Sequence, residues 1–432
     1  MQASRSAQAD RTSCIQTFGV VLPDLIIESI LDPDHPNQLR LHTWDGRKAA
    51  TTPTTSYRGC TYTPAPIAGG LANAVRFPAT SKPFGSAAKL TASMREFLSR
   101  YVGLAPEAAA LLIAFALATY FVDCLPIAPV LYLLGPDNEV SLVRRLLGCL
   151  CRRPVLLGDI DMAALGTLPS QLEATLLINQ RNLAQRVTRI LLASNNRHFC
   201  IARGNGRLNA YGAKAFSTDP EFADGIGVHL SLSPAQDPLP TLTDADEKEI
   251  TNDFQTKLLR YRMVNHRRVR EAQLDFRDFV PAMRDEVRTW LAPICDCPDL
   301  QKSVSSSLLQ QSREAEGDRL SDDRCMVAEA ALFFCHKAKT EHFFVGDLAE
   351  CVNTLLKGRH EDRALTDKMV GLLLRALGIH GRRVVQGYRI LLTDAVREQI
   401  HGIARAYQVL SAQDGVPGCR HCPGGKVNGR RG

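Results

Sequence analysis

The sequence has no apolar run long enough to cross a membrane. The best candidate, residues 108–122, reads AAALLIAFALATYFV and is interrupted by Asp123 and by the prolines of DCLPIAPV. A membrane-spanning helix needs about 20 consecutive apolar residues, so this run predicts a buried helix that leads into a buried strand. The opening residues, MQASRSAQAD, are polar and lack the apolar segment of a secretion signal. We therefore expect a cytoplasmic protein with no membrane partner.

The cysteine pattern does not suggest a disulfide framework, because the 13 cysteines are scattered and odd in number. Most are expected to be reduced and buried. Cys419-Arg-His-Cys422 has the spacing of half a zinc site, but no second pair lies close in sequence. A flexible tail with two free thiols is the favoured alternative, and His336, on an apolar helix, is expected to be a core or flanking residue. We expect neither a metal nor another cofactor.

Positive charge gathers near the C-terminal end. The chain has a net charge of +7, and residues 360–432 alone contribute 12 basic and 6 acidic side chains. A second basic run, residues 257–270, holds six Lys and Arg side chains within a predicted helix. A basic end on a balanced body suggests a polyanion partner. The alternatives are a solvated surface for the C-terminal end and a solvated bridging helix for residues 257–270.

Two patterns distinguish the first half of the chain. Residues 1–85 hold short alternating runs such as QLRLHTW and SYRGCTYT, which predict strands. Residues 86–122 predict helices, the first with one apolar face. The members of this face are Leu90, Met94, Phe97, Leu98 and Tyr101.

From 129 to 235, short apolar runs alternate with helical patterns. The predicted strands are VLYLLG, RPVLLGDI, EATLLIN, HFCIARGN and AKAFST. Near-continuous apolar strands separated by helices predict a parallel sheet that is covered on both faces. The segment GNG at 204–206 fits a hairpin turn, and 303–323 is read as a loop or a frayed helix.

The segment GPDNEVSLV lies where a phosphate-binding loop would join the first of these strands to a helix. Such a loop reads Gly-x-x-x-x-Gly-Lys-Ser/Thr. Here Gly135 is present, Ser141 is the hydroxyl nearest the metal position, and Asn138 stands among residues that replace the glycines and lysine. The strand EATLLIN ends in Asn179 instead of an acidic pair for Mg²⁺. Gly135, Asn138, Ser141 and Asn179 are therefore predicted to form an altered nucleotide site without hydrolytic activity.

Residues 319–410 read as helix, strand, helix, helix and a two-stranded ribbon, the order of a winged helix. The helix LTDKMVGLLLRALGI is the predicted recognition helix, with Met369, Val370, Leu373 and Leu377 supplying most of its buried face. The candidate DNA-binding residues lie on this helix and on the ribbon. They are Lys368, Arg375, Arg382, Arg383 and Arg389. Protein docking is the alternative role for this region.

Three runs carry a resemblance to a known class. LATYFVDCLPIAPVLYLLGPDNEVSLVRRLLGCLCRRPVLLGD resembles the entry to the P-loop (AAA+-type) ATPase core of phage- and plasmid-type helicase-like proteins. GRLNAYGAKAFSTDPEFADGIGVHLSLSP resembles their sensor strand, and the run from VAEAALFFCHK to IHGIARAY resembles the winged-helix tail of bacterial mobile-element proteins with this core. The resemblance spans residues 86–407 and implies a P-loop NTPase-like α/β core. The defining Lys and Asp are absent.

These observations predict five segments. Residues 1–85 form a β-containing region, 86–235 an altered P-loop-like core, 236–318 a charged helical linker, 319–410 a winged helix and 411–432 a flexible basic tail. The expected function is non-catalytic, in a nucleic-acid-associated or regulatory protein whose partners are DNA or other proteins. The alternatives are an ATP- and Mg²⁺-dependent helicase-like motor and a protein-interaction adaptor.

Overall fold

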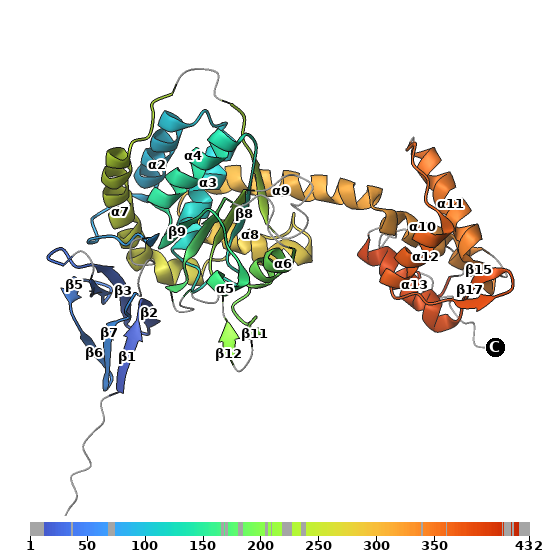
Figure 1. Ribbon diagram of the computed structural model, residues 1–432, viewed down its shortest axis with the longest axis horizontal. Coiled ribbons are helices and arrows are strands. Elements are labelled where there is room, and N and C mark those ends of the chain that lie inside the picture. Colours follow the sequence, from blue (N-terminus) through green and yellow to red (C-terminus); the bar gives the residue numbers. More distant parts are fainter. Residues whose placement is uncertain are drawn as a thin grey trace, which may run out of the picture. The chain divides into compact units, whose positions relative to one another are not determined.

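A computed structural model shows two compact units, Met1–Gln311 and Ser312–Gly432 (Figure 1). The structure describes residues 13–35, 38–67, 74–165, 168, 172–179, 185–203, 206–208, 210–217, 227–234, 239–337, 340–359, 361–407, 409, 416 and 419–422. Within this part of the chain, no helix combines the length and the apolar character needed to span a bilayer.

The first unit begins with two small β-sheets. One has the order β1-β7-β6, built from Ser13–Thr17, Cys60–Pro64 and Thr55–Tyr57. The other is an antiparallel meander of β2 (Gly19–Leu22), β3 (Leu25–Leu31), β4 (Leu39–Trp44) and β5 (Ala49–Thr52). The predicted strands in QLRLHTW and SYRGCTYT are confirmed as β4 and as the β6–β7 hairpin.

Two helices precede the main sheet. Helix α2 (Ala87–Tyr101) starts at Ser86, whose hydroxyl accepts the Lys89 N–H, and all five residues of its predicted apolar face are buried. Helix α3 (Pro106–Thr119) is buried from Ala109 to Thr119. It is followed by the buried strand β8 (Val130–Leu134), so the expected succession of buried helix and buried strand is confirmed.

The expected parallel sheet is confirmed as five strands in the order β14-β8-β13-β10-β9. They are β8, β9 (Pro154–Leu157), β10 (Thr175–Ile178), β13 (Lys214–Ser217) and β14 (Val228–Ser231). Helix α4 (Asp137–Leu150) joins β8 to β9, α5 (Met162–Leu165) lies between β9 and β10, and α6 (Gln185–Ala193) precedes β13. Because all pairs are parallel, the carboxyl ends of the strands share one edge.

One predicted strand of this sheet lies elsewhere. HFCIARGN contributes β11 (Ile201–Arg203), which pairs antiparallel with β12 (Gly206–Leu208) in a separate hairpin. The strands on either side of GNG are paired as a hairpin requires, while Gly204 and Asn205 themselves lie outside the described residues. The assignment of HFCIARGN to the parallel sheet was wrong. A short antiparallel partner that begins three positions after the end of β11 competes successfully with the large sheet for this strand.

Both faces of the sheet are buried. In β8, Leu131 and Leu133 join an apolar cluster formed with α2, α3, α4 and α7 (Asp244–Arg270), while Val130 and Tyr132 join a second cluster with α5 and α6. Successive side chains of a strand point to opposite faces. Two apolar layers on the two faces explain why these strands are nearly continuous apolar runs.

Helices follow the parallel sheet along the chain. After α7 come η3 (Pro281–Met283), α8 (Arg284–Leu291), η4 (Ala292–Ile294) and α9 (Pro298–Ser321). Residues 303–323 were predicted to be a loop or a frayed helix, and α9 covers this segment up to Ser321, so the helical alternative holds there. Val304 and Leu308 are buried in the core of the first unit, and their packing stabilises a helix that Ser-rich sequence disfavours.

The second unit has its own apolar core. Its elements are α10 (Asp323–His336), β15 (His342–Phe344), α11 (Val345–Gly358), α12 (Asp367–Ala376), β16 (Arg382–Val384), β17 (Gly387–Leu391) and α13 (Asp394–Ala406). The three strands form an antiparallel sheet of order β15-β17-β16. The core includes Met326, Phe343, Leu348, Val370 and Ile390.

Candidate functional site

The carboxyl edge of the parallel sheet is where an α/β fold of this kind binds ligands. There, only Gly135 and Pro136 connect the end of β8 to the start of α4. Pro136 has no N–H, and it is the N-cap of α4 without a side-chain hydrogen bond to the helix. A two-residue connection offers few backbone N–H groups, so it cannot wrap around a phosphate as a longer glycine-rich loop does.

The backbone at Gly135 explains why glycine stands there. Gly135 has φ +140°, and a Cβ at this position would lie 2.6 Å from the carbonyl oxygen of Leu232. The Leu232 N–H also donates to the Leu134 carbonyl at 2.7 Å, just past the end of β14. Close approach of the two strand ends therefore requires glycine, whether or not a ligand binds.

The other predicted nucleotide-site residues lie near this edge. Asn138 is exposed on the first turn of α4, Ser141 is half-buried, and Asn179 is exposed directly after β10. The first turn of α4 also carries Asp137 and Glu139, whose negative charges oppose the binding of another anion at the helix N-terminus.

Arg145, one turn further along α4, does not supply a cation in place of the missing lysine. Arg145 donates to Glu247 at 2.6 Å and to the Leu242 carbonyl at 3.0 Å, so its guanidinium is held against α7.

The sequence prediction did not include Ser217, the last residue of β13, which pairs in register with Leu133. Its buried hydroxyl has no hydrogen-bond partner among the described residues.

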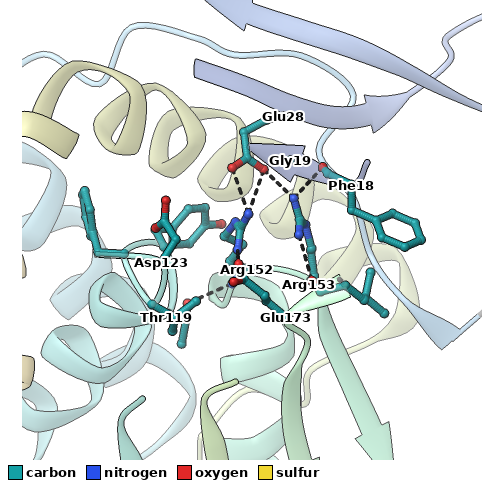
Figure 2. Close-up of polar contacts among 12 residues, drawn as sticks. Phe18, Gly19, Glu28, Thr119, Asp123, Arg152, Arg153 and Glu173 are labelled. Carbon is teal, nitrogen blue, oxygen red and sulfur yellow. Dashed lines mark hydrogen bonds and ion pairs between the residues drawn. The ribbon is translucent and has the colours of Figure 1, made fainter. Parts of the chain in front are cut away.

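A buried ion network lies between the N-terminal sheet and the core (Figure 2). Glu28 of β3 accepts hydrogen bonds from Arg152 at 2.8 Å and from Arg153 at 2.7 Å, two residues that directly precede β9. Arg262 of α7 donates to the same carboxylate at 2.7 Å. The side chains of Glu28 and these three arginines are all less than 5% exposed. Elements more than 120 residues apart thus meet at one carboxylate.

The network extends to the turn that follows α3. Arg262 makes two hydrogen bonds to Asp123, at 2.7 and 2.8 Å, and His266 approaches the same carboxylate at 2.9 Å. Arg262 is therefore buried inside the first unit, so the prediction that the basic side chains of 257–270 face a polyanion or solvent was wrong for this residue, whereas Arg267, Arg268 and Arg270 are exposed. The apolar surroundings of Arg262 leave this cation bound to two carboxylates instead.

Burial and charge act in opposite directions on the two acids. Burial alone would raise the pKa of Glu28, but the guanidinium groups of Arg152, Arg262 and Arg153 outweigh it and lower the pKa to about 2. Burial likewise opposes ionisation of Asp123, whose pKa is nevertheless held well below its ordinary value by Arg262 and His266. Both groups are ionised near neutral pH, and the network is a paired structural element.

The second unit brings its five candidate cationic residues onto α12 and the β16–β17 ribbon. Lys368 and Arg375 are exposed and lie two turns apart on α12. Arg375 stacks on Tyr388, with the guanidinium carbon 5.5 Å from the ring centroid, and Tyr388 pairs across the ribbon with Arg383. Cross-strand partners share one face of a sheet, so Arg375 and Arg383 flank the same ring.

The other two arginines form a second pair. Arg382 and Arg389 face each other across the ribbon, where Arg382 is exposed and Arg389 is half-buried. Like charges directly opposite each other destabilise a ribbon. Because successive side chains of a strand point to opposite faces, Arg382 and Arg389 lie on the face of the ribbon opposite Arg383 and Tyr388. We call the set of Lys368, Arg375, Arg382, Arg383 and Arg389, which covers α12 and both faces of the ribbon, the basic surface.

The packing of α12 differs in part from the sequence prediction. Val370 is buried as expected, but Met369 is 44% exposed, and Leu374 is buried in its place. The assignment of Met369 to the core was therefore wrong.

Cys419 and Cys422 lie beside His336 of α10 and His401 of α13, two residues that sequence spacing alone did not connect with them.

No family model matches the sequence, and no curated protein matches it. Two solved structures of the NrS-1 C-terminal region, in the apo A form, align at 10% and 11% identity with TM-scores of 0.37 and 0.35. They cover 85% of this chain and 97% and 96% of those chains. Drosophila ORC bound to DNA aligns at 14% identity with a TM-score of 0.19, over 76% of this chain and 95% of that one. TM-scores this low do not establish a shared fold.

Proposed function

We propose that the protein binds DNA through a winged helix in its second unit and that it does so without hydrolysing nucleotide. The observation that carries this proposal is the basic surface on α12 and the β16–β17 ribbon. Arginine and lysine on a helix and an adjacent ribbon are suited to contact phosphates, and arginine can also reach base edges in the major groove.

The element order supports the assignment of a winged helix. The chain runs through α10, β15, α11, α12, β16, β17 and α13, and β15 pairs with β17. In this arrangement α12 is the recognition helix and the β16–β17 hairpin is the wing. Thr366 begins α12 by accepting the Met369 N–H, and Asp367 is the one acid in the helix's first turn.

The parallel core supports a P-loop-like scaffold. Counted along the chain, its five strands stand in the order 5-1-4-3-2, and the first strand ends at Gly135 before a helix. The short connection, the acids of α4 and the neutral Asn179 favour a scaffold role over hydrolysis.

Salt-dependent DNA binding tests the proposed function. We expect the full chain to bind a DNA duplex at low salt and to lose affinity steeply as salt rises, because bound phosphates release counterions. Arg375→Ala/Arg383→Ala should weaken binding and lower the slope of log K against log salt by about 2. Fluorescence anisotropy with a labelled duplex measures both quantities.

A matched variant controls for the loss of two charges. Arg47→Ala/Lys48→Ala removes two exposed basic side chains from the turn between β4 and β5. It should leave the affinity and the slope unchanged. Absence of binding by the wild-type chain at low salt would reject the proposal.

Nucleotide binding is a separate prediction. We expect neither saturable ATP binding in the presence of Mg²⁺ nor phosphate release above background, since no lysine lies between Gly135 and Ser141. Calorimetric titration and a phosphate-release assay measure the two quantities. ATP hydrolysis that Ser141→Ala or Asn179→Ala abolishes would support the motor function instead, whereas hydrolysis that both variants retain would indicate a contaminating enzyme.

Protein docking is the second candidate function, because large apolar side chains are exposed near the basic surface. Val385, at the turn of the ribbon, is fully exposed, and Met369, Leu372, Tyr388 and Leu391 are each 42–57% exposed. Exposed apolar side chains on a surface helix and its neighbouring ribbon are suited to protein contacts. A chain that fails to bind DNA at low salt but binds a protein partner through Val385 and Leu372 would favour this function.

A further inference from the structure

Four potential metal ligands from three separate segments converge in the second unit. His336 is the last residue of α10, His401 lies in α13, and Cys419 and Cys422 come from the segment that follows. One ligand atom from each of the four residues lies within 4.8 Å of all the others.

The distances between these atoms fit a tetrahedral metal site. The two Nε2 atoms of His336 and His401 are 3.0 Å apart, Cys419 Sγ lies 3.3 Å from His401 Nε2, and Cys422 Sγ lies 3.2 Å from His336 Nε2. Tetrahedral zinc, with bonds of about 2.0–2.1 Å to nitrogen and 2.3 Å to sulfur, places two nitrogens about 3.3 Å apart and a nitrogen and a sulfur about 3.6 Å apart. The ligand atoms would move apart by a few tenths of an ångström to accommodate the ion.

The hydrogen bonding of His401 points its free lone pair into the cluster. His401 Nδ1 lies 2.6 Å from the Arg397 carbonyl oxygen, which can only accept, so Nδ1 carries the proton. In the neutral ring, Nε2 then has a lone pair, and both His336 and Cys419 approach it. A proton shared with His401 Nε2 could join it to His336 or to Cys419, but not to both, whereas a cation at the centre of the cluster would contact all four ligands. A carbonyl on the opposite ring nitrogen is also the usual outer-shell partner of a zinc-bound histidine.

Burial further suggests a built site. The His401 side chain is fully buried, and Cys422 is 6% exposed within the apolar core of the second unit. His336 and Cys419 are half-buried. A closed set of four protein ligands, with no position left for water, is typical of structural zinc.

We propose that His336, His401, Cys419 and Cys422 bind one Zn²⁺ ion, which fastens the segment after α13 to α10 and α13. Two neutral imidazoles and two thiolates give the site a net charge of zero with the ion bound, and each thiol releases one proton on binding. This inference does not depend on DNA binding. A disulfide between Cys419 and Cys422 is the competing state, and it would leave the two histidines without a metal.

Metal analysis of the full chain tests the proposal. Protein purified under reducing conditions and supplied with Zn²⁺ should retain one zinc per chain after dialysis, measured by plasma mass spectrometry. Cys419→Ser/Cys422→Ser should lose it. The matched control, Cys14→Ser/Cys200→Ser, removes two exposed thiols outside the cluster and should keep the full stoichiometry.

Cobalt spectroscopy can be carried out on the wild-type chain, so its result does not depend on whether a variant folds. The wild-type chain loaded with Co²⁺ should show the visible bands of tetrahedral cobalt and a thiolate-to-cobalt charge-transfer band. His336→Cys keeps four ligands, so it should still bind one ion and raise the charge-transfer intensity by about half, because three thiolates replace two. A reduced wild-type chain that binds no Zn²⁺ or Co²⁺, or a Cys419→Ser/Cys422→Ser variant that retains its zinc, would overturn the proposal. So would an intact Cys419–Cys422 disulfide that persists under reducing conditions.

Discussion

Replacing Glu28 with glutamine is expected to destabilise the protein by about 3–5 kcal/mol. The substitution keeps the size of the side chain but removes the charge that three buried guanidinium groups share. Arg262 retains Asp123, whereas Arg153 is left with the carbonyl oxygens of Phe18 and Leu172. Most of the lost stability comes from leaving a buried guanidinium, that of Arg153, without a carboxylate partner. Urea unfolding of the full chain, followed by circular dichroism, measures the change in the free energy of unfolding.

An exposed ion pair in the N-terminal region provides the control. Asp24 lies 3.5 Å from Arg58, and both side chains are more than two-thirds exposed. Asp24→Asn should therefore change stability by less than about 1 kcal/mol. Equal effects of the two substitutions would contradict a special role for the buried network.

Acid should remove the stabilisation that Glu28 provides. Its pKa is lowered from 4.5 to about 2, so the contribution is complete above pH 4.5 and is lost as the pH falls toward 2. The Glu28→Gln variant lacks this contribution, and its stability should approach that of the wild type at the acid end of the range.

Lys214 should make stability rise with pH in the alkaline range. Its side chain is fully buried at the start of β13, where Nζ donates to the carbonyls of Gly212 and Ser194. Burial lowers the pKa of Lys214 from 10.5 to about 7. Between these values the unfolded chain binds more protons than the folded chain, so a rise in pH favours folding. Relative to Lys214→Met, the wild type should gain a few kcal/mol from pH 7 to pH 10.5.

The difference in stability between wild type and Lys214→Met isolates the contribution of Lys214 to the pH dependence. Cysteines with raised pKa values in the folded chain, such as Cys124 and Cys151, titrate in the unfolded chain over the same range and oppose the trend, but they are present in both proteins. Lys89→Met removes an exposed ammonium from α2 and is the matched control. A stability difference between wild type and Lys214→Met that stays constant with pH would contradict this prediction, because it would show that Lys214 carries the same charge in the folded and the unfolded chain.

Local patterns made much of the fold predictable. The alternating apolar positions of α2 and the continuous apolar strands β8, β9, β10 and β13 were predicted correctly, because neighbouring residues in the sequence determine them. Helix α9 was left open between a loop and a frayed helix, because its serines suggest a loop while its buried Val304 and Leu308 pack in the core of the first unit. In the second unit, one turn of α12 was assigned the wrong apolar side chain, Met369 in place of Leu374.

The long-range clusters could not be predicted from local spacing. Glu28 and Arg262 are 234 residues apart, and His336 and Cys422 are 86 apart. The available signals were weak ones: an acid within the apolar strand LIIESIL, paired arginines before β9, and a Cys-x-x-Cys segment. Each shows that a polar residue needs a partner, but only the fold identifies which one.

The shared carboxylate of Glu28 also constrains how the gene can change during evolution. Recombination that replaced the N-terminal sheets alone would remove the anion while leaving Arg152, Arg153 and Arg262 in the helical and α/β part. A donor segment would have to supply an acid at the same depth and orientation. We therefore expect the N-terminal sheets and the parallel core to be inherited together, with breakpoints excluded from the stretch between Glu28 and Arg262.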